Sequence, residues 1–201
     1  MNIATHKTRK TETPTWDIAY LFPPQGGWHE EEYLELDTNR LIELTDGFLE
    51  VLPMPTMTHQ LIALYLYRAL LAFAAPRRLG TVLAAPFPIQ LREGVMREPD
   101  VMFMLSKHAS QMDERYWKKA DLVMEVVSNS GRRRDLTIKR REYARAGIPE
   151  YWIVEPQKSQ ITVLHLAGTR YTVHGTFSKG GEATSALLEG FQVDVSAAMK
   201  G

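Results

Sequence analysis

The chain has 201 residues and contains no cysteine. Its length suits one domain with a hydrophobic core, and the absence of cysteine excludes disulfides, thiolate metal sites and cysteine nucleophiles. The 24 lysine and arginine residues balance the 24 aspartate and glutamate residues, so the net charge is zero. Because a protein that coats nucleic acid by bulk electrostatics is usually basic, any contact with nucleic acid must come from a local patch.

Residues 1–27 predict a flexible N-terminal tail, because the segment is largely polar and ends in the turn-rich sequence PPQGG. Residues 28–201 predict a single domain. The chain shows neither a signal-peptide core nor a run of about 18 apolar residues. We therefore expect no membrane span and, given the missing cysteines, a cytoplasmic location.

Two elements are expected directly after the tail. Three consecutive glutamates within residues 29–36 suit the positive end of a helix dipole, so a short helix is predicted there. Residues 40–52 predict a β-hairpin with Asp46 and Gly47 in its turn.

A long helix is predicted for residues 57–75, with Thr56 or Thr58 as its cap and Pro76 after its end. This helix is apolar on nearly every side, so we expect a sheet or a partner chain to bury it.

The rest of the chain predicts mainly strands. Apolar or alternating runs favour strands at residues 81–85, 88–91, 100–105, 122–128, 150–156, 161–166, 171–177 and 191–195. A helix is predicted for residues 134–146, ended by Gly147, and segments 92–99 and 178–185 are predicted turns or loops. This order of elements predicts an α+β fold, with a mixed β-sheet flanked by helices and with additional β-hairpins.

Glu125 does not fit a purely structural pattern. In the strand at 122–128 it shares one face with Val123 and Val127, and both faces are otherwise apolar. A buried carboxylate costs several kcal/mol unless it is paired or binds a cation. Two explanations stay open, an ion pair with an arginine of a neighbouring helix and a metal ligand.

Asp100 and Lys139 are the other two main candidates. Asp100 begins the strand at 100–105 after a proline, where turn aspartates are also common. On the predicted helix Asp135, Lys139 and Tyr143 share one face at intervals of four residues, which is also the spacing of solvated salt bridges.

Arg132, Arg133 and Arg134 lie at the entry of the same helix, where cations oppose the helix dipole. These three arginines are candidates for binding a phosphate backbone, and a solvated basic turn is the alternative.

Taken together, these residues are typical of one chemistry. Two carboxylates on adjacent strands can hold Mg²⁺ or Mn²⁺ through oxygen ligands and leave positions for water and a phosphate oxygen. The cation would lower the pKa of a bound water and stabilise the charge on an attacked phosphodiester. A lysine beside that water can orient or deprotonate it and can neutralise the phosphate.

Three runs of the sequence carry a family resemblance. They are RLIELTDGFLEVLPMPTMTHQLI, REPDVMFM and DLVMEVVSNSGRRRDLTIKRREYARAGIPEYWIVEP, and together they resemble the Uma-two (Uma2) family of the PD-(D/E)XK nuclease superfamily. The similarity covers about residues 28–198. It implies a restriction-endonuclease-like fold, a Mg²⁺- or Mn²⁺-dependent endonuclease that acts on DNA, and a homodimer.

By this resemblance Asp100 matches the aspartate of the PD motif, Glu125 the acidic residue of the next strand, and Lys139 a lysine on the helix. The three would be the catalytic residues, with Asp100 and Glu125 as the metal ligands. In the standard superfamily pattern the lysine lies two residues after the acid, where this chain has Val127.

Four further residues are candidates for lining the site. Glu43 and His59 match early residues of the family, and Asp135 and Tyr143 share the helix face of the lysine. For His59, packing in the first turn of a helix is the alternative.

The sequence thus supports three functions to different degrees. The first is a metal-dependent DNA endonuclease. The second is a domain that keeps the nuclease fold but only binds nucleic acid or a protein partner, which the neutral charge and the displaced lysine favour. The third is a sheet-rich assembly module, since the helix at 57–75 is so apolar.

Overall fold

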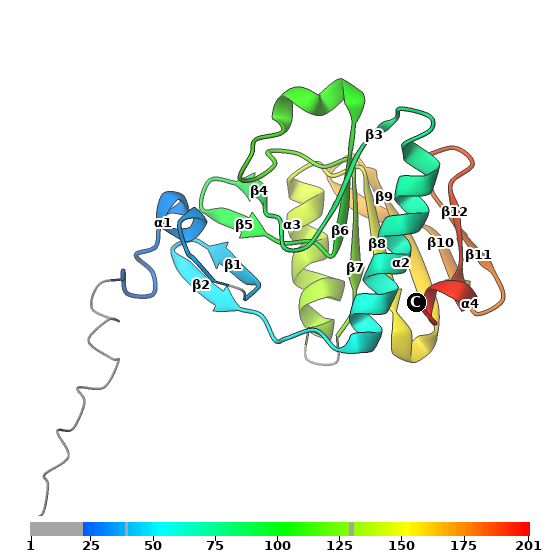
Figure 1. Cartoon of the computed structure of the whole chain (residues 1–201), viewed down its shortest axis with the longest axis horizontal. Coiled ribbons are helices and arrows are strands. Elements are labelled where there is room, and N and C mark those ends of the chain that lie inside the picture. Colours follow the sequence, from blue (N-terminus) through cyan, green and yellow to red (C-terminus); the bar gives the residue numbers. More distant parts are fainter. Residues whose placement is uncertain (1–21, 39, 129–130) are drawn as a thin grey trace, which may run out of the picture.

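The computed structural model describes residues 22–38, 40–128 and 131–201. Its centre is a six-stranded sheet in the order β10-β9-β8-β7-β6-β3 (Figure 1). The strands are β3 (Gly80–Ala84), β6 (Val101–Leu105), β7 (Leu122–Val126), β8 (Glu150–Glu155), β9 (Gln160–Ala167) and β10 (Arg170–Ser178). β7 and β8 are parallel and the other neighbours are antiparallel, so the sheet is mixed, as predicted.

Helices cover both faces of this sheet (Figure 1). α2 (Met57–Ala74) packs on one face, and the π-helix η3 (Arg134–Lys139) with its continuation α3 (Arg140–Arg145) packs on the other. The alternation of strand side chains explains the two cores, because in β7 Met124 packs with the α2 side and Val123 with the α3 side. The predicted α+β fold is therefore confirmed.

α2 begins where the sequence indicated. The Thr56 side chain accepts a hydrogen bond of 3.2 Å from the backbone nitrogen of His59, so Thr56 is the cap. The sheet buries only one side of the helix, since Leu66 is fully buried whereas Leu64 and Leu71 are 46% and 38% exposed. Neither α2 nor any other helix in the described part of the chain has the length and apolar character that crossing a membrane requires.

A smaller sheet lies beside α3 in the order β2-β1-β5-β4 (Figure 1). Its strands are β1 (Ile42–Thr45), β2 (Phe48–Val51), β4 (Ile89–Arg92) and β5 (Val95–Arg97). The β1–β2 hairpin turns at Asp46 and Gly47, as predicted, and both residues have positive φ. The prediction of a turn for residues 92–99 is wrong at β5, because Arg97 looks like a solvated residue in sequence but is buried and bonded to Glu142.

The C-terminal region forms a further hairpin. β11 (Glu182–Thr184) pairs with β12 (Gln192–Asp194), and the short helix α4 (Val195–Ala198) follows. The predicted loop at 178–185 is therefore wrong at β11, where only Ala183 is buried and the polar neighbours hide the strand pattern.

The segment before the smaller sheet packs against its β1–β2 hairpin. The predicted short helix is α1 (Glu30–Leu34). The Gln25 side chain exchanges hydrogen bonds of 2.8 and 3.1 Å with the backbone of Leu49, and the Gly26 nitrogen donates to the Gly47 carbonyl at 2.8 Å. The end of the predicted tail is therefore attached to the hairpin, and residues 1–21 of that tail lie outside the described residues.

Candidate active site

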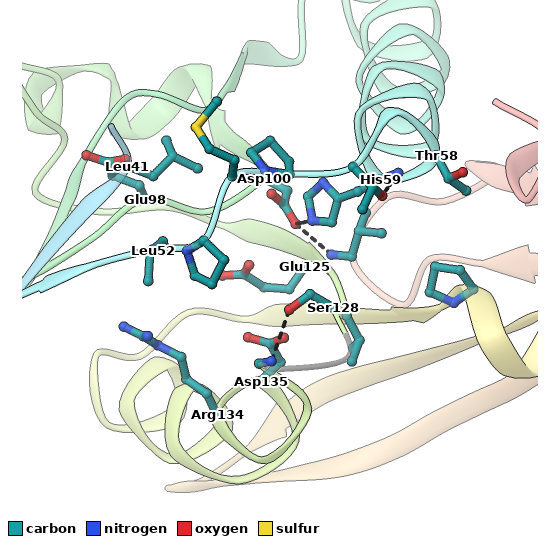
Figure 2. Close-up of a pocket in the computed structure, with 18 of the residues that line it drawn as sticks. Leu41, Leu52, Thr58, His59, Glu98, Asp100, Glu125, Ser128, Arg134 and Asp135 are labelled. Carbon is teal, nitrogen blue, oxygen red and sulfur yellow. Dashed lines mark hydrogen bonds and ion pairs between the residues drawn. The ribbon is translucent and has the colours of Figure 1, made fainter. Parts of the chain in front are cut away.

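Strand pairing brings two carboxylates to the same place. β6 and β7 are antiparallel neighbours with Val101 opposite Met124, and continuing this register by one residue places Asp100 opposite Glu125. The backbone nitrogen of Val126 donates a hydrogen bond of 2.7 Å to Oδ2 of Asp100. Figure 2 shows both carboxylates facing the same pocket.

The pocket has a volume of about 320 Å³. Since a water molecule occupies about 30 Å³ of liquid, this is room for roughly ten waters. The space is therefore sufficient for a hydrated cation together with one phosphate group.

Glu125 is held from the helix side of the sheet. Its Oε1 accepts hydrogen bonds from Nζ of Lys139 at 2.7 Å and from the hydroxyl of Tyr143 at 2.5 Å. Burial, with the added repulsion of Asp100 and Asp135, raises the pKa of Glu125 to about 8 although Lys139 lowers it. The carboxylates around the pocket thus outnumber the cations in contact with them, which favours a bound cation.

Lys139 reaches this site from η3, whereas Val127, two residues after Glu125, packs into the core. Its ammonium also lies 3.1 Å from Oε1 of Glu43 and 3.9 Å from Oδ1 of Asp135. Burial alone would lower the pKa of Lys139, but the carboxylates led by Glu125 outweigh it and raise the pKa, so the ammonium stays charged.

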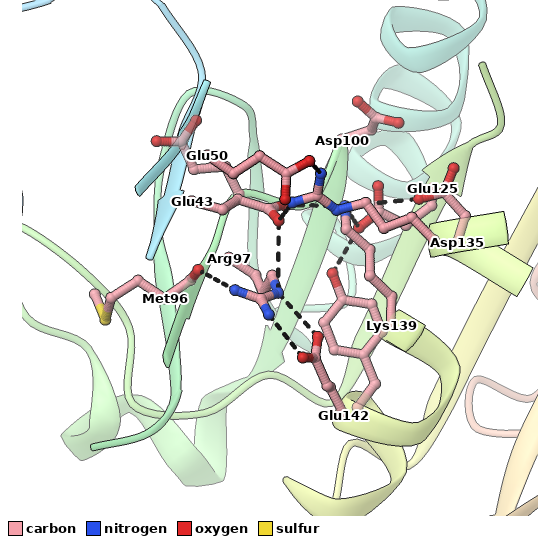
Figure 3. A network of polar contacts seen from close by, with 12 residues as sticks. Glu43, Glu50, Met96, Arg97, Asp100, Glu125, Asp135, Lys139 and Glu142 are labelled. Carbon is pink, nitrogen blue, oxygen red and sulfur yellow. Dashed lines mark hydrogen bonds and ion pairs between the residues drawn. The ribbon is translucent and has the colours of Figure 1, made fainter. Parts of the chain in front are cut away.

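Glu43 lies behind Lys139 and belongs to a buried charge network (Figure 3). Its carboxylate contacts Arg97 at 3.5 Å and pairs with Arg134. Arg97 in turn makes hydrogen bonds of 2.9 and 2.7 Å to the two oxygens of Glu142. This network joins the smaller sheet to the helix that carries Lys139.

The other predicted lining residues occupy different positions. His59 and Asp135 line the pocket, whereas Tyr143 lies behind Glu125. Nε2 of His59 is 3.3 Å from Oδ2 of Asp100. Burial lowers the pKa of His59, but the hydrogen bond and the charge of Asp100 outweigh it, so the pKa lies above its ordinary value.

The three arginines are not equivalent. Arg132 pairs with Glu155, and Arg134 at the pocket pairs with Glu43 and Glu50. Arg133 is exposed. Two of the three candidate phosphate-binding groups are thus already engaged by carboxylates.

Glu98 also lines the pocket and was missed in the sequence. Its Oε1 accepts a hydrogen bond of 3.2 Å from the hydroxyl of Tyr33, and its Oε2 is buried without a hydrogen-bond partner among the described residues. Burial raises the pKa of Glu98 to about 7. The signal was its spacing of two residues from Asp100, which places both side chains on one side of an extended chain.

The pocket suits a cation held by two carboxylates. Among the described residues no three histidine, aspartate or glutamate side chains form a ready-made metal site. Mg²⁺ is often bound by one or two carboxylates, with water and substrate phosphate completing the shell. In the described part of the chain, hydrogen bonds to this pair fall on Oδ2 of Asp100 and Oε1 of Glu125, which leaves the second oxygen of each for a ligand.

The mixed sheet with helices on both faces, and with a pocket between two neighbouring strands, is a restriction-endonuclease-like fold. A solved structure described as a putative nuclease belonging to DUF820 from Anabaena variabilis ATCC 29413 shares this fold, with a TM-score of 0.66 and 14% sequence identity. The alignment covers 86% of this chain and 97% of that chain.

The family model Uma2, described as putative restriction endonuclease, matches residues 30–196, and the chain belongs to this family. The resemblance drawn from the sequence motifs is thereby confirmed. No match was found among curated proteins.

Proposed function

We propose that the chain is a metal-dependent endonuclease that hydrolyses phosphodiester bonds of DNA. Asp100 and Glu125 would hold Mg²⁺ or Mn²⁺, and Lys139 would contact the reacting phosphate. The observation that carries this proposal is the convergence of two carboxylates from adjacent strands and a buried lysine on one pocket. Membership of the Uma2 family, which is described as putative restriction endonuclease, supports it.

A cation bound at this position would supply an activated water and would stabilise charge on the attacked phosphodiester. The chain's own groups orient the site. The backbone of Val126 and the ring of His59 fix Asp100, while Lys139 and Tyr143 fix Glu125. Because Lys139 stays charged, its part is to stabilise negative charge on the phosphate and to orient the water rather than to remove a proton.

The first test is cleavage of plasmid DNA with Mg²⁺ or Mn²⁺. We expect Asp100→Asn and Lys139→Met each to lower the rate at least roughly 100-fold. Glu182→Gln, an exposed change on β11, serves as the control and should leave the rate unchanged. Metal-dependent cutting that both site variants retain in full would remove the assignment of the site.

The alternative is a nuclease-fold domain that binds without cutting. It is favoured by the ion pairs that already engage Lys139 with Glu43 and Glu125. Calorimetric titration with Mn²⁺ separates the two functions. A stoichiometric site that Glu125→Gln abolishes argues for the nuclease, and the absence of any such site argues for the binding domain.

The homodimer is a further proposal, which rests on the family resemblance alone. Sedimentation that shows only monomer at micromolar concentration would contradict it.

A further inference from the structure

A second hollow, of about 190 Å³, opens directly beside Asp100. Its walls are the loop between β2 and α2, the first turns of α2, and the end of β3 with the residues after it. Leu41, Leu52, Leu64 and Pro86 are among its lining residues, and Met54 is a largely exposed residue on its loop side. Its lining is largely apolar, and Asp100 is its one carboxylate among the described residues, whereas Glu98, Glu125 and Asp135 also line the acidic pocket.

The hollow and the acidic pocket are neighbours that share part of their lining. Asp100, His59 and the loop at residues 52–55 line both of them, so Asp100 stands at their border. Leu41 and Leu52, which Figure 2 shows beside the acidic pocket, line the hollow as well. Within the described residues, no lysine or arginine lines the hollow, and its one histidine, His59, is already engaged with Asp100.

The chemistry of a nucleic acid strand matches this pair of sites. Phosphates alternate with nucleosides, so a phosphate at Asp100 and Glu125 places the neighbouring nucleoside within reach of the hollow. The faces of a nucleobase are apolar, and its edge carries donors and acceptors. Gln60 lines the hollow and is exposed, so its amide can both donate to and accept from that edge.

A base can enter this hollow only after leaving the stack of a duplex. That step is easiest for a base that is unpaired already. Binding of a long duplex also requires many free cations along the phosphates. Near the pocket, however, Arg132, Arg134 and Lys139 are engaged by carboxylates, and the net charge of the chain is zero.

On the basis of the proposed nuclease function, we infer that the enzyme cuts DNA at unpaired nucleotides, with the base next to the scissile phosphate bound in the hollow beside Asp100. The hollow is then the subsite that selects the substrate.

The test compares four oligonucleotides of one sequence in the presence of Mn²⁺. They are a perfect duplex, the same duplex with one bulged thymidine, that bulge with an abasic residue in place of thymidine, and the single strand. We expect the bulged duplex and the single strand to be cut roughly tenfold faster than the perfect duplex. Loss of the bulged base should lower the rate roughly tenfold.

The variant Leu64→Glu places a charge in the hollow at an exposed helix position, so the fold should tolerate it. It should abolish the preference for the base over the abasic residue. Leu71→Glu is the matched control, because this leucine lies on the same helix at similar exposure but does not line the hollow. Leu71→Glu should keep the preference of the wild type.

The same oligonucleotides, labelled with a fluorophore and studied by anisotropy without divalent metal, separate this inference from the nuclease proposal. Cutting that is indifferent to the base overturns the subsite and leaves the nuclease intact. Base-dependent binding that Leu64→Glu removes, without cutting by any variant, supports the subsite and overturns the nuclease. Binding that is equal for the thymidine and abasic strands overturns the subsite, and an apolar side chain of a protein partner is then the alternative occupant of the hollow.

Discussion

Glu43 is the residue whose replacement should disturb this protein most clearly. It is 1% exposed and lies 3.1 Å from Nζ of Lys139 and 3.5 Å from Nε of Arg97, and it also pairs with Arg134. Glu43→Gln keeps the shape of the side chain but removes its charge. Three cations, two of them deeply buried, then have one carboxylate fewer.

The magnitude follows from the partners that remain. Removal of one member of a buried ion pair costs about 3–5 kcal/mol. Each cation keeps another carboxylate, since Glu125, Glu142 and Glu50 still contact Lys139, Arg97 and Arg134 in that order. We therefore expect the lower end, a loss of about 3 kcal/mol in the free energy of unfolding. For a chain of this size that corresponds to a Tm lower by roughly 6–12 °C.

Urea unfolding at pH 7, followed by circular dichroism, measures this loss. Glu50→Gln is the control, because Glu50 lies directly opposite Glu43 in the hairpin and also binds Arg134, but is exposed. Exposed ion pairs contribute at most about 1 kcal/mol, so the control should lose no more than that. Equal losses in the two variants would refute the view that the buried network stabilises the fold.

The pH dependence gives a second check. Burial by itself raises the pKa of Glu43, but Lys139, Arg97 and Arg134 outweigh it, so the pKa lies below its ordinary value of 4.5. The stabilisation is then complete above pH 4.5 and is lost as the pH falls further. The difference in stability between wild type and Glu43→Gln should therefore shrink below pH 4.5, and a difference that grows there would contradict the argument.

Further predictions concern single contacts. Tyr143→Phe removes the hydroxyl that donates to Glu125 and leaves a buried acceptor without this partner, so it should lower the free energy of unfolding by about 1–3 kcal/mol. Urea unfolding measures this loss, and a loss under about 0.5 kcal/mol would contradict the prediction. Gly80→Ala would place its Cβ 1.9 Å from the carbonyl oxygen of Met104 and should cost about 3 kcal/mol in thermal unfolding. Gly147→Ala meets no atom within 4 Å but keeps a φ of +72°, so it should cost only about 1 kcal/mol; a reversed order of the two glycine variants would refute the steric argument.

Much of the fold could be predicted from the sequence, because its long elements carry strong local signals. α2 has its cap at Thr56, and β7 is a continuous apolar strand. β5 and β11 could not be predicted, since each is short and lies in a polar, glycine-containing segment that is typical of a turn. The burial of Arg97 depends on Glu142, which lies 45 residues away in the chain, so no local pattern could indicate it.

The candidate site, like the fold, could be predicted only in part from the sequence. Glu125 stood out because a carboxylate in an apolar strand needs compensation, and the structure supplies Lys139 and Tyr143 beside it. The position of Glu43 behind the lysine could not be read, because it depends on how the smaller sheet docks against η3. The roles of these residues in catalysis and metal binding stay predictions until the variants are measured.

The π-helical conformation of η3 has a consequence for insertions and deletions. A π-helical turn contains an additional residue compared with an α-helical turn. Deleting one residue between Asp135 and Lys139 would therefore restore regular winding and keep the orientation of the flanking segments, whereas the same deletion in an α-helix rotates one end against the other by about 100°. The segment before Lys139 should thus tolerate the loss of one residue that would turn one half of α2 away from the main sheet.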